Sequence, residues 1–428
     1  MQIMKASHQR LLKRREFLRH TLAGATALGL PAWVHAETSH QLAGKLLGVT
    51  LQHPENPSEE KSSILELDLA SGAVHYHELP DHRLGHSLVM LPDGGYFAVP
   101  YGDDDVSCLF LDEQFRATGE VKPPTGHGYA GHATLLPDGR HLFGHFNQSG
   151  YGDEEALDPD QTGQRYVVDR ITGEVVETKA TSILHAHDIL LTRDQTHVIV
   201  GDDGTLSMRM GDTLKASDDP FALTPGTPQI VVFNAKDLAE VRRIPLDING
   251  ALVHLTEDRE GRIVGASEQF VANNEAGLKA LRDLLGDDVP MYVDHLNEAL
   301  IKLGVELPYP GPLVRVNPES GDVATHLAPY HQMPFDVDMN RVTGRVFHVF
   351  TASGMMARFD PLKKSWGYFS TEPYGIQQPY SVTDIPGTSF MAINGFLEGV
   401  AVFDTLTMRQ VIKFDTHNFG IKHIQYRA

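Results

Sequence analysis

GHGYAGHATLLPDGRHLFGH, residues 126–145, contains two short apolar segments separated by a Pro-Asp-Gly turn at residues 137–139. Its apolar residues do not recur at helical spacing, and Pro-Asp-Gly between apolar runs favours a tight turn. The stretch therefore predicts a strand, a turn and a second strand. It also contains four histidines: His127, His132, His141 and His145.

The same strand–turn–strand pattern recurs along the chain. It occurs at residues 87–100, 133–146, 188–201, 252–265, 335–350 and 380–395, and a shorter remnant lies at 423–428. A second pair of strands usually follows, with an apolar-x-apolar-Asp or Asn segment before a Gly-containing turn. Units of four short strands, repeated with turns between them, are typical of a β-propeller. The sequence therefore predicts an all-β fold of this architecture.

The count of repeats predicts seven blades. The first blade has only three strands of its own, at 45–51, 64–70 and 73–79, and the C-terminal remnant would be its missing innermost strand. Pairing of the two chain ends would close the ring and leave no open sheet edge. A ring of six or eight blades, or two sandwiches, would leave one unit unpaired. We therefore expect one seven-bladed propeller over residues 42–428.

Two connections are longer than the repeat requires. One covers about residues 204–227. The larger covers about 267–311, where NEAGLKALRDLLG and VDHLNEALIKLG have apolar residues at helical spacing. The sequence predicts a small helical insertion there. Long insertions in a compact ring often carry function, and a helical hairpin packed on the ring as a lid or contact surface fits the pattern equally well.

The N-terminus predicts export. Residues 1–36 combine a basic segment, a short apolar run and a small-x-Ala ending at Ala36, which is the pattern of a secretory signal peptide. The pair Arg14 and Arg15, followed by Glu-Phe-Leu, resembles the twin-arginine export motif. We expect cleavage after Ala36 and a periplasmic location. The alternative is a frayed basic helix.

Composition excludes several classes of partner. The formal net charge of −20 argues against binding nucleic acid or an anionic membrane surface. No run of the sequence is long and apolar enough to span a membrane. The single cysteine, Cys108, cannot form an internal disulfide, and its apolar context SCLFL predicts a buried structural thiol.

The residues at the heads of the expected innermost strands are mostly histidine. In chain order they are His86, His132, His187, His254, Asp336, Ser381 and His423. The innermost strands of a propeller run beside its central channel, so these heads would surround one mouth of it. His127 and His185 are expected near the same end, the latter because residues two apart on an extended segment point to the same side.

Imidazoles that converge on one point either hydrogen-bond to one another or bind a cation, and imidazole suits zinc, copper, iron and nickel. We therefore expect one transition-metal ion, zinc first and iron second. The alternative for any one histidine is a structural hydrogen bond to the backbone of an adjacent strand. The ligands expected first are His132, His187 and His254, followed by His86, His423 and Asp336, with His127 and His185 as further candidates.

The motifs also carry a family resemblance. In order, GHS (85–87), AGHATLLPDGR (130–140), AHDILLTRD (186–194), PQIVVFNAKDLAE (228–240) and VHL (253–255) resemble a bacterial family of periplasmic WD40- or YVTN-like propellers of unknown function. The genes of that family often accompany imelysin-type iron-uptake genes. The chain is more distantly similar to periplasmic propeller zinc metallochaperones, which pass zinc to the binding protein of an ABC transporter. It lacks the acidic His-rich run that some of those carry near the mature N-terminus. Both resemblances imply metal handling, with an imelysin-type protein or a transporter binding protein as the partner.

Three classes of function follow from the sequence. The first is a periplasmic zinc or iron chaperone, or an accessory protein for metal uptake, that is not an enzyme. No GxSxG motif and no Gly-rich phosphate loop followed by a helix occurs in the sequence, so no catalytic residue is expected. The second class is a lactonase-like metal-dependent hydrolase or a lyase, which an acidic ring at the channel would favour. The third is an interaction scaffold without metal, which would hold its ring histidines by bonds to the backbone.

Overall fold

The computed structural model describes residues 42–52, 61–79, 85–101, 106–148, 163–183, 185–202, 228–246, 248, 251–268, 312–327, 336–350, 354–395, 398–416 and 419–428. The predicted signal peptide, residues 1–36, lies outside these residues. So does the predicted helical insertion at about 267–311, except for residues 267 and 268, which belong to a strand.

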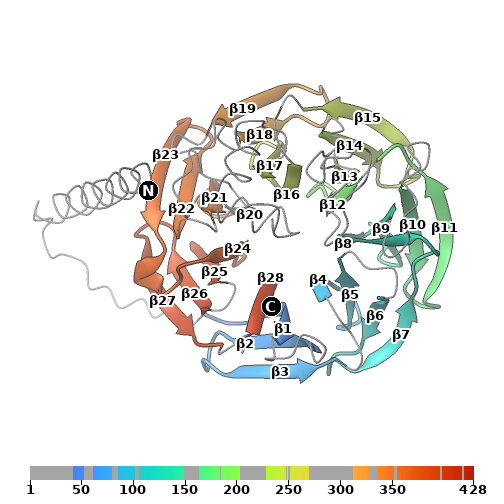
Figure 1. The fold of residues 1–428 in the computed structure, drawn as a ribbon. Coiled ribbons are helices and arrows are strands. Elements are labelled where there is room, and N and C mark those ends of the chain that lie inside the picture. Colours follow the sequence, from blue (N-terminus) through green and yellow to red (C-terminus); the bar gives the residue numbers. More distant parts are fainter. Residues whose placement is uncertain are drawn as a thin grey trace, which may run out of the picture.

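The described chain forms seven four-stranded antiparallel sheets arranged as blades around a central channel (Figure 1). This confirms the predicted all-β, seven-bladed propeller. The short 3-10 helix η4 (Glu372–Tyr374) is the only helix among the described residues. From the innermost to the outermost strand, blade 1 contains β28 (Phe419–Arg427), β1 (Lys45–Gln52), β2 (Lys61–Asp68) and β3 (Val74–Glu78). Blade 2 contains β4 (Gly85–Met90), β5 (Tyr96–Pro100), β6 (Cys108–Leu111) and β7 (Ala117–Val121).

The remaining five blades repeat this plan. Blade 3 contains β8 (His127–Leu135), β9 (His141–Gln148), β10 (Gln164–Asp169) and β11 (Glu174–Ala180). Blade 4 contains β12 (Ala186–Leu191), β13 (His197–Asp202), β14 (Gln229–Asn234) and β15 (Glu240–Pro245). Blade 5 contains β16 (Ala251–Glu257), β17 (Ile263–Glu268), β18 (Pro312–Val316) and β19 (Val323–Leu327). Blade 6 contains β20 (Asp336–Asn340), β21 (Arg345–Phe350), β22 (Met355–Asp360) and β23 (Ser365–Ser370). Blade 7 contains β24 (Pro379–Asp384), β25 (Phe390–Gly395), β26 (Gly399–Asp404) and β27 (Arg409–Phe414).

The C-terminal strand closes the ring as the repeat count predicts. β28 pairs antiparallel with β1, from Lys45 opposite Arg427 to Gln52 opposite Phe419. Blade 1 is therefore built from both ends of the described chain. Its innermost strand, β28, is the last strand in the sequence. Closure of this kind covers the edge of β1, which would otherwise be open to pairing with another chain.

The hydrophobic core lies between neighbouring blades. Alternate residues of a strand point to opposite faces of its sheet, and on β5 Tyr96 and Ala98 pack toward blade 1 while Phe97 and Val99 pack toward blade 3. The same division of faces produces a buried cluster at each of the seven blade interfaces. Each blade thus depends on both of its neighbours for the burial of its apolar side chains. Cys108 is one of these buried side chains, as predicted.

Candidate metal centre

The innermost strands form a closed ring around the channel (Figure 1). Neighbours contact one another in the order β4, β8, β12, β16, β20, β24 and β28, and β28 returns to β4. Five of these strands, which belong to the consecutive blades 1 to 5, carry one histidine each of the set predicted for the channel mouth. These residues, called here the histidine cluster, are His423, His86, His132, His187 and His254.

Each of the five histidines lies at or beside a β-bulge. On β4, Gly85 pairs with Pro100 and Ser87 pairs with Val99, so His86 is an extra residue without a partner on β5. Bulges bend a strand and redirect side chains, which is why they are frequent beside functional sites. We attribute the inward aim of the His86 ring to this extra residue.

The other four strands show the same irregularity. Register shifts occur at residues 129–133 on β8, 186–189 on β12, 252–254 on β16 and 421–424 on β28. β24 has a shift at 379–381 and carries no histidine. β20 has no shift over its paired length. Six of the seven inner strands thus contain a bulge, and five of these bulges lie at or beside a histidine of the cluster.

Four imidazoles form a chain of short nitrogen–nitrogen contacts. Nε2 of His254 lies 3.3 Å from Nε2 of His187 and 3.1 Å from Nε2 of His423. Nε2 of His423 lies in turn 3.1 Å from Nε2 of His86. His132 completes the cluster, because one ring nitrogen from each of His86, His132, His254 and His423 lies within 4.8 Å of the other three. Nitrogens of these four rings therefore converge on one point, and His187 contacts the group through Nε2 of His254.

The cluster is nearly shielded from solvent. His86 and His187 are each 5% exposed, and His254 is 2% exposed. The side chains of His132 and His423 retain 14% and 13% exposure. Solvent contact is therefore concentrated at these two rings.

Two buried carboxylates lie behind the rings. Nδ1 of His132 lies 3.3 Å from Oδ1 of Asp188. Nδ1 of His254 and Nδ1 of His423 each lie 3.9 Å from an oxygen of Asp336, which is near enough for electrostatic attraction and too far for a direct hydrogen bond. A histidine that binds a metal usually donates its second ring N–H to a carboxylate or a carbonyl, which orients the ring. Asp188 is placed to do this for His132.

Backbone N–H groups hold both carboxylates in place across blade interfaces. Oδ2 of Asp188 accepts the N–H of Leu255 on the next blade at 2.7 Å. Oδ2 of Asp336 accepts the N–H of Val382 on the next blade at 3.0 Å. The same carboxylates thus tie neighbouring inner strands together and face the rings of the cluster.

Burial keeps the imidazoles neutral. It lowers the pKa of His86, His132, His187 and His423 well below the usual range, and repulsion from neighbouring rings lowers it further. Burial also raises the pKa of Asp188 and Asp336, although the backbone N–H donors oppose this. A neutral imidazole offers a lone pair, which is the form that binds a metal.

These donors fit a transition-metal ion. In a tetrahedral site with metal–nitrogen bonds of about 2.0–2.1 Å, ligand nitrogens lie about 3.3 Å apart, close to the 3.1–3.3 Å spacings here. Nε2 of His132 is buried and has no hydrogen-bond partner among the described residues. Buried polar atoms without partners are rare, and a metal ion at the centre of the cluster would satisfy this one.

The structure orders the expected ligands differently from the sequence. The three expected first, His132, His187 and His254, are all in the cluster. His86 and His423, expected second, are central to it, because His423 contacts both His254 and His86. The sequence could not predict the order of these five histidines as ligands, because that order depends on how far each bulge turns its ring toward the channel.

Four expected ligands lie outside the group of nitrogens that converge within 4.8 Å: His187, which contacts the group through His254, and Asp336, His127 and His185. Asp336 lies behind two of the rings. His127 lies at the start of β8 with Nδ1 3.3 Å from the carbonyl oxygen of Thr125. His185 lies beside Tyr101, with 6.1 Å between ring centres. The group within 4.8 Å contains neither His127 nor His185.

Sequence reasoning missed Asp188 and Lys422. Asp188 directly follows a channel histidine in AHD, and the signal was available because adjacent strand residues face opposite sides. Lys422 directly precedes His423, and its Nζ lies 5.2 Å from the centre of the Tyr380 ring. The charge of Lys422 acts on His86, His187 and His423, whose pKa values it helps to lower.

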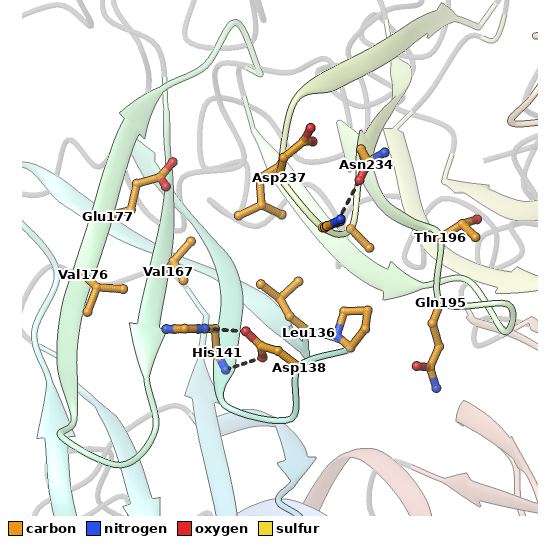
Figure 2. A pocket seen from close by; sticks show the side chains of 14 residues that line it. Leu136, Asp138, His141, Val167, Val176, Glu177, Gln195, Thr196, Asn234 and Asp237 are labelled. Carbon is orange, nitrogen blue, oxygen red and sulfur yellow. Dashed lines mark hydrogen bonds and ion pairs between the residues drawn. The ribbon is translucent and has the colours of Figure 1, made fainter.

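A hollow lies between blades 3 and 4 (Figure 2). It has a volume of about 710 Å³, and turns of blades 3 and 4 and the side chains of Val167 and Val176 line it. Its polar rim is occupied by local bonds: Asp138 pairs with His141, and Asn234 accepts the backbone N–H of Lys236. No residue of the histidine cluster lines this hollow.

The fold and the channel define the class of protein: a seven-bladed β-propeller with imidazoles gathered on its innermost strands. No protein-family model and no curated protein matches the chain. Two similar solved structures are a hydrazine synthase of Kuenenia stuttgartiensis and a protein from Lactobacillus plantarum. The first is 12% identical, covers 91% of this chain and 99% of its own, and has a TM-score of 0.53. The second is 12% identical, covers 90% and 99%, and has a TM-score of 0.57. At this identity the likeness concerns the fold alone.

Among the described residues, no helix has the length and apolar character needed to cross a membrane.

Proposed function

We propose that the chain binds one transition-metal ion at the histidine cluster. The observation that carries this proposal is the chain of Nε2 contacts from His187 through His254 and His423 to His86. Neutral rings held this close on a rigid scaffold are a preorganised ligand set, and they lose little freedom when a metal binds. Imidazole donors without a thiolate suit zinc or iron.

The direction of the ring nitrogens favours this proposal over a scaffold without metal. A structural histidine would direct its nitrogens to backbone groups of an adjacent strand. Here the contacting nitrogens face one another, and Nε2 of His132 has no hydrogen-bond partner among the described residues. Imidazole nitrogens joined in such a chain of contacts are better satisfied by a cation than by one another.

The position of the carboxylates favours binding over hydrolysis. A hydrolase or lyase on this scaffold would need acidic or amide groups that face the channel. Asp188 and Asp336 instead contact Nδ1 atoms and backbone N–H groups behind the rings. They are therefore placed to orient ligands rather than to handle a proton on a substrate.

We propose further that the protein handles metal in the periplasm, as a zinc or iron chaperone or as an accessory protein for uptake. The arginine pair and the signal-like segment at residues 1–36 support export. The motif order supports a partner that is either the binding protein of a metal ABC transporter or an imelysin-type iron-uptake protein. Delivery would require such a partner to remove the metal faster than solvent does.

Titration calorimetry on the chelator-treated full chain tests the proposal, with Zn²⁺ and, without oxygen, Fe²⁺. We expect one ion per chain with a Kd below about 1 µM. His86→Ala with His423→Ala should abolish this binding, because it removes two of the four rings in the contact chain. The matched control is His75→Ala with His141→Ala, which changes two histidines outside the cluster. Absence of sub-micromolar binding, or equal binding by the two double variants, would overturn the proposal.

A further inference from the structure

Two aspartates lie beside each other at the interface between blades 6 and 7. Asp338 is on β20, the innermost strand of blade 6, and Asp384 ends β24, the innermost strand of blade 7. The backbone N–H of Asp384 donates to Oδ2 of Asp338 at 2.8 Å, so this contact joins the two strands directly. Neither residue belongs to the histidine cluster. The interface therefore holds two carboxyl groups that influence each other.

Asp338 is well supplied with hydrogen-bond donors. Its Oδ1 accepts the hydroxyl of Thr256 at 2.9 Å and the backbone N–H of Met339 at 2.7 Å, while its Oδ2 accepts the N–H of Asp384. Hydrogen bonds of this kind stabilise the ionised form of a carboxyl group. Burial raises the pKa of Asp338, and these three donors oppose the rise. Both oxygens of Asp338 are thus placed to carry a negative charge.

Asp384 has one oxygen without such a donor. Its Oδ1 accepts the side-chain amide of Asn340 at 2.8 Å and the backbone N–H of Arg341 at 3.3 Å. Its Oδ2 is buried and has no hydrogen-bond partner among the described residues. Asp384 is only 5% exposed, so little water can replace the missing donor. A charged oxygen in such a place is costly, and a proton on Oδ2 would remove the charge.

The charged groups of blade 6 that face Asp384 act on it in opposite directions. Nε of Arg341, in the turn after β20, lies 3.6 Å from Oδ2, and the side chain of Arg341 is 60% exposed. Water screens an exposed guanidinium, so its attraction is weak. Burial and the repulsion from Asp338 prevail, and they raise the pKa of Asp384 to about 7. On the other side, the partner of Asp384 on β25 is the uncharged Met391.

We infer that Asp338 and Asp384 form a proton-binding site between blades 6 and 7, with the proton on Oδ2 of Asp384. In mildly acidic solution the pair holds this proton and carries a single negative charge. In mildly alkaline solution the proton leaves, and two carboxylates repel each other across the interface. The contact between β20 and β24 is therefore strongest below neutral pH. This inference does not depend on metal binding, because the two blades contribute no histidine to the cluster.

The proton should stabilise the folded chain in acid relative to alkali. An unfolded aspartate titrates at about pH 3.9, so between that pH and about 7 the folded chain holds a proton that the unfolded chain has released. The free energy of unfolding therefore falls as pH rises through this window, which is opposite in sign to the effect of a buried histidine. Urea unfolding should show this fall in the unaltered chain relative to Asp384→Asn, with slopes against pH that differ by up to about one proton.

Infrared spectroscopy of the metal-free full chain detects the proton itself, because the C=O stretch of a protonated carboxylic acid lies apart from carboxylate and amide bands. The spectrum of the unaltered chain minus that of Asp384→Asn should contain this band at about pH 5.5 and lose it by about pH 8.5, on either side of the raised pKa. Asp360→Asn is the matched control in blade 6. The side chain of Asp360 is 22% exposed, and its Oδ1 accepts the backbone N–H of Leu362. This variant should keep the whole band.

Two further variants test the neighbours of Asp384. Asp338→Asn removes the repelling charge and should lower the pH at which the band is lost by about one unit or more. Arg341→Met removes the weak attraction and should raise that pH by a few tenths of a unit, roughly the scale of an exposed ion pair. The side chain of Arg341 is largely exposed, so this variant keeps the inference testable even where a change at the buried pair prevents folding.

Three results would overturn the inference. The first is a band that does not change between the two pH values. The second is equal intensity of the band in Asp384→Asn and Asp360→Asn, which would place the proton on another residue. The third is a pH of loss that neither Asp338→Asn nor Arg341→Met moves, because the proton would then lie outside the field of this pair. None of these results bears on metal binding at the histidine cluster.

Discussion

Gly131 leaves the space that the ring of His86 occupies. A Cβ atom on residue 131 would lie 2.7 Å from Cδ2 of His86 and 3.2 Å from its Nε2. The two residues belong to neighbouring blades, and the hydroxyl of Ser87 donates to the carbonyl oxygen of Gly131 at 2.6 Å. The absence of a side chain at residue 131 therefore sets where one ligand of the cluster can lie.

Gly131→Ala should displace the His86 ring and weaken metal binding by at least about tenfold, because a contact of this length forces a shift of the ring or the backbone. Gly131 also has φ 91°, which adds backbone strain to any substitution. Gly126→Ala is the matched control, since Gly126 has φ 77° and nothing within 4 Å of its Cβ position. Calorimetry should show a loss of metal affinity in the first variant only, while thermal unfolding should show a loss of stability in both. Equal metal affinity in the two variants would contradict this prediction.

Asp188→Asn should reduce metal affinity by about 10- to 100-fold, the usual effect of losing a carboxylate that orients a ligating histidine. The amide has no negative charge to attract the Nδ1–H of His132, which lies 3.3 Å from Oδ1. Asp138→Asn is the control, because Asp138 pairs with His141 outside the cluster. The measurement is a competition titration against a chelator of known affinity. An unchanged affinity in Asp188→Asn would show that Asp188 serves only the contact between blades 4 and 5.

Acid should unfold the metal-free protein through its buried histidines. Burial lowers the pKa of His348 to about 3, whereas an unfolded histidine titrates near about 6.5. Between these values the unfolded chain binds the extra proton, so the free energy of unfolding falls as pH decreases from about 6.5 toward 3. One such residue contributes a slope of up to about 1.4 kcal/mol per pH unit. Neither ring nitrogen of His348 has a hydrogen-bond partner among the described residues.

His348→Phe removes that proton site and keeps a planar ring of similar shape. Urea unfolding at several pH values should give a slope against pH that is smaller by about one proton in this variant. His141→Phe serves as control, because His141 is only half-buried. If the His348 variant keeps the full slope, the acid sensitivity belongs to other buried histidines, such as those of the cluster or His145, whose pKa burial also lowers to about 3.

Removal of residues 423–428 should destabilise the whole propeller. The deletion takes away the pairs from Lys45–Arg427 to Gly48–Ile424 that join β1 to β28, and it exposes this part of the β1 edge. His423→Ala removes one candidate metal ligand and leaves the strand in place. Thermal unfolding should show a large loss of Tm in the truncated chain and a small one in His423→Ala. Similar Tm values for both would show that closure contributes little.

Export is a prediction from sequence alone, since residues 1–41 lie outside the described part. Arg14→Lys with Arg15→Lys should leave the precursor in the cytoplasm. Fractionation of cells and detection of the two forms by size measures this. Lys5→Arg with Lys13→Arg retains the basic charge and the arginine pair, and it should be exported normally. Equal export of both double variants would indicate the general secretory route.

The sequence predicted the ring and its closure because both depend on repeat spacing. Apolar strands with turns at regular intervals occur in seven copies, and the copy at residues 423–428 lacks partners anywhere except at the start of the chain. The histidines at the strand heads could be aligned for the same reason. The ranking of these histidines as ligands could not be predicted. Alternation along a strand predicts the face to which each side chain points, and a bulge changes that face. His185 and His187 illustrate this: they are two apart, yet only His187 belongs to the cluster.

The position of His423 on the closing strand β28 determines when the histidine cluster can assemble. The histidines of the cluster extend along the sequence from His86 to His423. A fragment that lacks β28 therefore cannot contain the assembled cluster. Metal loading, if it occurs at this cluster, would report that the closing strand is in place.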